Sequence, residues 1–110
     1  MKNRISRVNQ LIKEKIADIL LKEIFVRDVL ITVQDVDTTK DLKYTEIKVS
    51  VMPFEKSKEV LKILKRQTPN IQKELGKFVK IKFLPKIEFQ IDETEEKADK
   101  IEKILKKIKM

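Results

Sequence analysis

Few side chains in this 110-residue chain are suited to chemistry on a bound molecule. It contains no histidine and no cysteine, which excludes an imidazole base, a thiol nucleophile and a disulfide framework and removes the usual zinc ligands. The carboxylates Asp35, Asp37 and Asp41 are the candidates for a magnesium site, and Tyr44 is the candidate for a catalytic acid. No glycine-rich loop lies beside them, because the single glycine is Gly76. Turn roles for the aspartates and a packing role for Tyr44 are favoured, so we expect no catalysis, no metal and no cofactor.

Basic side chains are far more numerous than candidate catalytic or metal-binding groups. The chain has 26 lysines and arginines against 18 acidic residues, a formal net charge of +8. Residues 56–82 alone hold nine basic and two acidic side chains. A solvated lysine face would explain some of this charge. Such a one-sided excess favours contact with a nucleic-acid backbone, because phosphates release counterions when lysines approach them.

The first half of the chain contains the patterns of one helix and two strands. Apolar residues recur every three or four positions from Ile5 to Ile24, which predicts one long helix that ends near Phe25. Residues 30–36 and 44–51 are rich in β-branched side chains, and the polar stretch between them predicts an antiparallel hairpin. One face of the second strand is expected to consist of Thr45, Ile47, Val49 and Val51.

A proline lies in the middle of the next helical pattern. We predict a short helix over residues 57–67 and a second helix that starts at Thr68–Pro69. Thr68 suits the N-cap position, and Pro69 suits the first helical position, which needs no amide hydrogen. The two helices would meet at a sharp corner. The buried stripe of the second helix is expected to be Ile71, Leu75 and Phe78.

The remaining patterns complete an α+β fold. Alternation predicts a third strand over about 86–92, with an earlier start before Pro85 as an alternative. A C-terminal helix is expected over about 95–109, with acidic residues at its start and lysines at its end. The order α-β-β-α-kink-α-β plus the C-terminal helix is that of a type II KH-like domain. The chain is expected to form a single domain over residues 1–110. No apolar run is long enough to span a bilayer, so a cytoplasmic protein is expected.

Several short stretches resemble the ribosome-binding factor A family along nearly the whole chain. They are Arg4-Ile5-Ser6-Arg7-Val8, Asp41-Leu42-Lys43-Tyr44 with the strand Ile47-Lys48-Val49-Ser50-Val51, Leu75-Gly76-Lys77, and Leu84-Pro85-Lys86-Ile87-Glu88-Phe89-Gln90-Ile91-Asp92. The resemblance implies a non-catalytic assembly factor that binds ribosomal RNA on the immature small ribosomal subunit and leaves before translation. It also implies a link with growth in the cold, and a fold whose helices cover one face of a three-stranded mixed sheet. One departure is that Gln67-Thr68-Pro69 stands where the family commonly has an Ala-any-Gly kink.

The candidate contact residues combine this resemblance with the charge distribution. Arg4 and Arg7 are chosen by the family match, and Thr68 and Asn70 because amides at a helix N-terminus favour anions. The lysines and arginine around the predicted corner complete the RNA-binding set: Lys62, Lys65, Arg66, Lys73, Lys77, Lys80 and Lys82. The expected partners are the small ribosomal subunit and its RNA, with no membrane and a monomer off the ribosome. A DNA-binding helix-turn-helix protein and a permanent ribosomal protein remain as alternatives.

Overall fold

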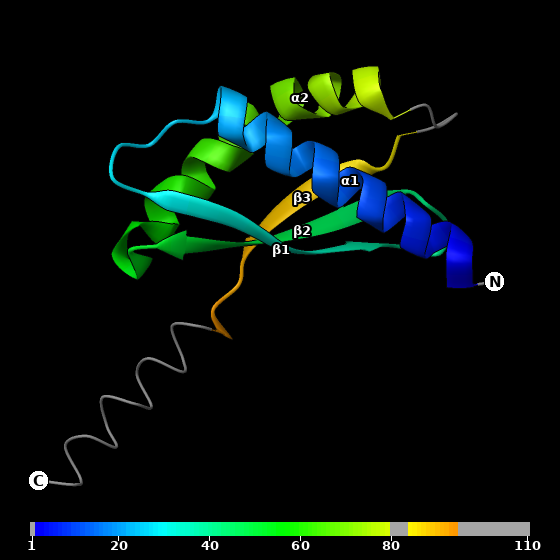
Figure 1. Ribbon diagram of the computed structural model, residues 1–110, viewed down its shortest axis with the longest axis horizontal. Coiled ribbons are helices and arrows are strands. Elements are labelled where there is room, and N and C mark those ends of the chain that lie inside the picture. The colour runs from blue at the N-terminus through cyan, green and yellow to red at the C-terminus, as the bar shows by residue number, and fades with distance from the viewer. Residues whose placement is uncertain (1, 80–83, 95–110) are drawn as a thin grey trace, which may run out of the picture.

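The computed structural model describes residues 2–79 and 84–94 (Figure 1). In chain order the elements are α1 (Lys2–Glu23), β1 (Leu30–Thr38), β2 (Tyr44–Met52), the 3-10 turn η1 (Phe54–Lys56), α2 (Ser57–Phe78) and β3 (Lys86–Ile91). The predicted C-terminal helix and the candidates Lys80 and Lys82 lie outside the described residues. Within those residues, no helix is long and apolar enough to cross a membrane.

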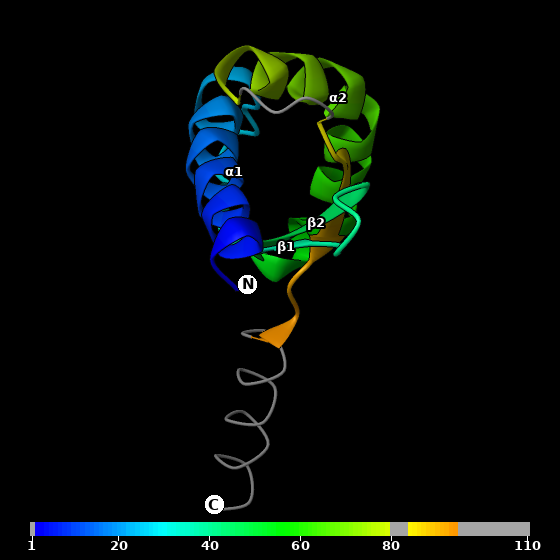
Figure 2. The ribbon, with the colours of Figure 1, turned by 90° about the vertical axis from the view of Figure 1, so that its right-hand side faces the viewer.

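The three strands form one mixed sheet in the order β1-β2-β3. The β1 and β2 strands pair antiparallel as a hairpin, and β3 pairs parallel with β2. Both helices cover the same face of the sheet, so that Figure 2 shows the helices and the sheet surrounding a common interior. The expected α+β fold, with its helices on one face of a three-stranded mixed sheet, is therefore confirmed.

The core lies between the helices and this covered face. The predicted face of β2 is confirmed, because Thr45, Ile47 and Val49 are fully buried and Val51 is 2% exposed. The helices contribute branched aliphatic side chains at spacings of three, four or seven residues, which places them on one side of each helix. These buried helical residues are Ile12, Ile16, Ile19 and Leu20 from α1 and Val60, Leu64, Ile71 and Leu75 from α2.

The β1 strand contains a β-bulge that sets which side chains reach the core. Val33 pairs with Val49 and Asp35 pairs with Lys48, so Gln34 is an extra residue on β1. An extra residue reverses the alternation of side chains between the two faces. Val33 and Val36 are three positions apart, yet both are buried. The Gln34 amide donates a hydrogen bond to the Ser50 hydroxyl at 2.9 Å.

The α2 helix is continuous from Ser57 to Phe78, with Pro69 inside it. The predicted division into two helices is therefore wrong, and Thr68 is not an N-cap. Its hydroxyl instead donates to the Leu64 carbonyl one turn earlier, at 2.7 Å. A proline within a helix and a threonine bonded back to the preceding turn both bend helices. Figure 2 shows α2 curving over the interior, so the sequence signal of a corner corresponds to a bend within one helix.

Polar side chains fasten each helix to the sheet. The Gln72 amide donates to the Pro85 carbonyl at 2.6 Å and accepts a hydrogen bond from the Ile87 amide at 3.0 Å, which ties α2 to the start of β3. The Thr38 hydroxyl donates to Asn9 of α1 at 2.5 Å and lies 3.0 Å from the Thr45 hydroxyl. These contacts fix the first turns of α1 beside the closed end of the hairpin.

Candidate nucleic-acid interface

The solvent side of α2 carries a basic stripe. Its members lie three, four or seven positions apart along the helix, with Arg66 beside Lys65, and therefore share one side. All are exposed, and the buried residues of α2 occupy the opposite side. We call this set the α2 stripe: Lys58, Lys62, Lys65, Arg66, Lys73 and Lys77.

The structure thus unites five of the candidates chosen from the sequence. Lys62, Lys65, Arg66, Lys73 and Lys77 all belong to the α2 stripe. Asn70 is exposed between Arg66 and Lys73, four residues after one and three before the other.

Lys58 was missed among the candidates. Its position four residues before Lys62, near the start of the predicted helix, was the signal that could have found it. It extends the α2 stripe to the second residue of α2.

The bend at Pro69 lies within the α2 stripe. Because proline has no amide hydrogen, it cannot donate to the Lys65 carbonyl one turn earlier. Pro69 and Lys65 are both exposed, so this carbonyl lies on the solvent side of the helix. Thr68 is partly buried and its hydroxyl hydrogen is used within the helix. The anion-binding helix N-terminus expected at residues 68–72 does not exist, since α2 begins at Ser57.

Arg4 and Arg7 lie apart from most of the α2 stripe. Both are exposed in the first two turns of α1, at the end fixed beside the hairpin by Asn9. The two helices meet further along, where Lys15 Nζ lies 5.3 Å from the centre of the Phe78 ring. A rise of about 1.5 Å per residue puts Arg7 about 12 Å along α1 from Lys15.

The end of α2 differs from expectation in one further respect. Phe78 was expected in the buried stripe but is 53% exposed, with its ring against Lys15. Lys77 is paired with Glu74, Nζ to Oε1 at 3.0 Å. This exposed pair reduces the positive charge that Lys77 presents to an anion. The other described members of the α2 stripe do not form an ion pair with Glu74.

The opposite face of the sheet is acidic. Outward positions of the three strands alternate with the buried ones. They carry four carboxylates and two lysines: Asp35, Asp37, Glu46 and Glu88, with Lys48 and Lys86. The Lys48 ammonium lies 3.8 Å from the Glu46 carboxylate. Among the described residues, positive charge is therefore concentrated on the helical side of the molecule and negative charge on the other face of the sheet.

Two of the three carboxylates that were candidates for a metal site, Asp41 and Asp35, have structural partners. The Asp41 carboxylate accepts hydrogen bonds from the Thr39 hydroxyl at 2.6 Å and the Lys43 amide at 3.0 Å. These bonds favour the ionised form and lower the pKa of Asp41 below its ordinary 3.8, with the Thr39 bond the largest cause. Asp35 accepts a bond from the Val36 amide at 3.0 Å. Across residues 2–79 and 84–94, no group of three or more potential ligands is arranged to hold a metal ion.

Tyr44 begins β2 and is 52% exposed. Its amide donates to the Thr39 hydroxyl at 3.2 Å. In this position it closes the hairpin through its backbone.

Comparison with known proteins identifies relatives over almost the entire chain. The family model described as "Ribosome-binding factor A" matches residues 4–105. Ribosome-binding factor A of Clostridium acetobutylicum is 40% identical over 113 aligned residues, covering 98% of this chain and 92% of the relative. The Halothermothrix orenii protein of the same name is 36% identical and covers 98% of this chain and 90% of the relative.

Solved structures show the same fold. The crystal structure of ribosome-binding factor A from Thermus thermophilus superposes with a TM-score of 0.68 at 22% identity, over 79% of this chain and 94% of that one. A solution structure from Thermotoga maritima, named a putative ribosome binding factor A, also has a TM-score of 0.68, at 24% identity, over 82% and 88%. A homology model of the Thermus thermophilus factor, fitted into a cryo-EM map of a 30S complex, has a TM-score of 0.67 at 23% identity, over 76% and 90%. The chain therefore belongs to the ribosome-binding factor A family.

Proposed function

We propose that this protein is a non-catalytic assembly factor that binds ribosomal RNA on the immature small subunit through the α2 stripe. The observation that carries the proposal is the segregation of charge. Six exposed basic side chains share one side of α2, while the outward positions of the sheet are predominantly acidic. The protein would act in the cytoplasm. It would be a monomer before it binds the small subunit.

Family membership supports the choice of partner. A homology model of a Thermus thermophilus relative was fitted into a map of a 30S complex. The lysines and arginines of the α2 stripe suit phosphate contacts, since these need positive charge and a regular spacing more than a defined pocket. Lys80 and Lys82, which lie outside the described residues, remain candidates because they belong to the same basic segment of the sequence.

The helix-turn-helix alternative loses its main support. It required two helices that meet at Thr68–Pro69, whereas α2 is continuous there. A permanent ribosomal protein differs from an assembly factor in occupancy. A factor is substoichiometric and absent from translating ribosomes, so its amount per particle in polysome fractions separates the two.

The test is co-sedimentation of the pure protein with immature and mature small subunits, large subunits and whole ribosomes, at low and raised salt. The test variant reverses three charges of the α2 stripe: Lys65→Glu, Arg66→Glu and Lys73→Glu. The matched control changes net charge equally, away from the α2 stripe: Lys43→Glu, Lys48→Glu and Lys86→Glu. All six side chains are exposed, so both variants should fold.

We expect retention on the small subunit, strongest with immature particles, to fall sharply for the test variant and far less for the control. Loss of three phosphate contacts should reduce the slope of log affinity against log salt by about 2–3. If both variants lost retention equally, binding would depend on the net charge of the protein and not on the α2 stripe. Equal binding to every particle would exclude the assembly role.

A further inference from the structure

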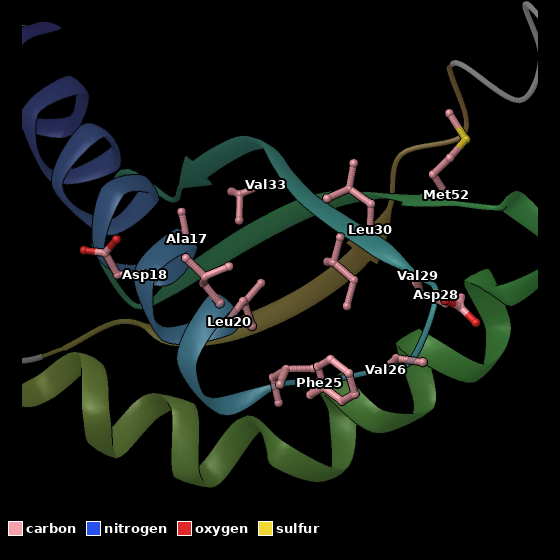
Figure 3. A pocket seen from close by; sticks show the side chains of 13 residues that line it. Ala17, Asp18, Leu20, Phe25, Val26, Asp28, Val29, Leu30, Val33 and Met52 are labelled. Carbon is pink, nitrogen blue, oxygen red and sulfur yellow. The ribbon is translucent and has the colours of Figure 1, made fainter.

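An open apolar hollow lies at the end of the sheet where α1 turns into β1 (Figure 3). It measures about 650 Å³, and its walls come from the end of α1, residues 24–29, β1 and Met52 at the end of β2. No residue of α2 lines it. A molecule seated here would leave the α2 stripe free for RNA.

The rim of the hollow consists of large apolar side chains in water. Phe25 is 88% exposed, Leu21 85%, Leu30 66% and Met52 50%. Leu30 and Met52 are paired across β1 and β2, so they are neighbours at the end of the sheet, and buried Leu20 lines the hollow from α1. An exposed surface of this kind on a soluble protein marks an interaction site.

The charge of the lining selects the kind of partner. Among the described residues that line it, Asp18 and Asp28 alone are ionisable, in a chain with a formal net charge of +8. Arg27 lies 3.9 Å from Asp28, but both side chains are about nine-tenths exposed, so this pair is weak. Two carboxylates beside an apolar rim disfavour RNA and anionic lipid, and they favour an apolar segment flanked by lysine or arginine.

We propose that this hollow docks a protein segment of the small-subunit particle in which apolar anchors are flanked by basic residues. The inference rests on the proposed function, because the particle brings the segment close. The factor would then hold RNA with α2 and a neighbouring protein with the end of α1 and the start of β1. Phe25 would be the main anchor, since aromatic side chains supply much of the energy of such contacts.

Photo-crosslinking tests this directly, because a chain without cysteine gives each engineered cysteine a unique label. Phe25→Cys and, on the α2 side, Asn70→Cys would each carry a benzophenone maleimide. Both positions are exposed, so neither label should unfold the protein. After binding to purified immature small subunits and illumination, the products are separated into protein and RNA adducts, and crosslinked peptides are sequenced by mass spectrometry.

We expect the label at position 25 to crosslink a protein segment with apolar residues and flanking lysine or arginine, and the label at position 70 to crosslink RNA. Adding Asp18→Lys and Asp28→Lys to the Phe25→Cys variant should lower its protein adduct roughly tenfold, as two rim attractions become repulsions. Adding Asp37→Lys and Glu88→Lys, which lie outside the hollow, should leave that yield nearly unchanged.

Several outcomes would overturn the inference. They are an RNA adduct at position 25, an adduct within the same chain or to a second copy of it, a partner segment without basic residues, or no adduct while position 70 still crosslinks RNA. In each of these the proposed function survives. Failure of both labels to crosslink the particle would reject the proposed function and this inference together.

Discussion

At the scale of single residues, short polar side chains determine the shape of the hairpin turn. The Thr39 hydroxyl donates to the Asp41 carboxylate and accepts from the Tyr44 amide, so one side chain holds both sides of the turn. Leu42 completes the turn with a φ of 61°, a backbone conformation that residues other than glycine rarely adopt. The hydrogen bonds of Asp41 help to hold this turn closed.

The lowered pKa of Asp41 makes part of the stability depend on pH. A carboxyl group with a folded-state pKa below its ordinary value stabilises the fold above about pH 3.8, and this contribution disappears as the pH falls through the folded-state pKa. Thr39→Val removes the main cause of the shift. We expect NMR titration to show a higher pKa for Asp41 in the variant. Denaturant midpoints should differ between variant and wild type at pH 6, and this difference should shrink at low pH. A difference that does not depend on pH should remain, because the variant also loses the hydrogen bond from the Tyr44 amide. A stability difference that is the same at every pH would contradict this role.

Gly76 offers a second test at the residue scale. It lies in the last turn of α2, where glycine costs about 0.5–1 kcal/mol relative to alanine. An added Cβ would lie 3.7 Å from a Leu84 methyl group, an ordinary contact. Gly76→Ala should therefore raise the free energy of unfolding by about that amount, measured by urea denaturation. Destabilisation would mean that the Leu84 contact is tighter than the structure shows. Weaker particle binding with raised stability would point to close RNA approach at this position.

At the scale of elements, α2 connects the basic surface to the sheet. The Gln72 amide supplies both a donor and an acceptor to the backbone at the start of β3. A side chain here completes hydrogen bonding that a further strand would otherwise provide. The bend at Pro69 lies one turn before this attachment, so helix shape and attachment are set by neighbouring residues.

Substitution of Gln72 measures the strength of this attachment. Gln72→Glu keeps the shape but replaces the donating nitrogen with an oxygen that repels the Pro85 carbonyl. Gln72→Leu removes both bonds and leaves the Ile87 amide without this partner. We expect each variant to lose about 1–3 kcal/mol of unfolding free energy at pH 7. The glutamate variant should recover part of its loss near pH 4, where its carboxyl group can donate, whereas the leucine variant should not. Equal pH profiles would argue against the two-bond geometry.

The sequence was informative wherever the elements follow one periodicity. The expected strands 30–36, 44–51 and 86–92 correspond to Leu30–Thr38, Tyr44–Met52 and Lys86–Ile91. The first was marked by β-branched residues, the third by alternation and the second by both. The error at Thr68–Pro69 arose because a threonine–proline pair also suits a helix start. The apolar spacing favoured one continuous helix instead. Leu64 and Ile71 lie on either side of the proline in the sequence, and their spacing of seven residues places them on the same side of such a helix.

Other features had no signal in the sequence. The Thr38–Asn9 bond joins residues 29 positions apart and follows no period, so the placement of Arg4 and Arg7 away from most of the α2 stripe was not predictable. Phe78 is exposed because α2 ends there and its ring meets Lys15 of α1, which depends on helix packing. The apolar hollow likewise needs three elements and a connection to be brought together, although each of its residues is unremarkable in the sequence.

At the scale of the whole molecule, opposite charges on the two layers give the protein a preferred orientation toward a polyanion. Reversing Lys65, Arg66 and Lys73 to glutamate should therefore slow association with the small subunit more than it speeds dissociation, most clearly at low salt. Stopped-flow or surface-binding kinetics at several salt concentrations would measure both rates. The matched control at Lys43, Lys48 and Lys86 should retain most of the association rate. A change confined to dissociation would mean that the α2 stripe forms short-range contacts without guiding the approach.

The bulge at Gln34 affects how the edge of the sheet can meet other protein chains. The β1 strand is an edge of the sheet, and exposed edges invite other strands to pair with them, which begins aggregation. The extra residue interrupts the ladder in mid-strand, and Asp35 and Asp37 follow it with exposed charges. A second chain could not extend this edge in register without facing both obstacles. The irregularity that brings Val33 and Val36 into the core thus also protects the edge from strand addition and fibril growth.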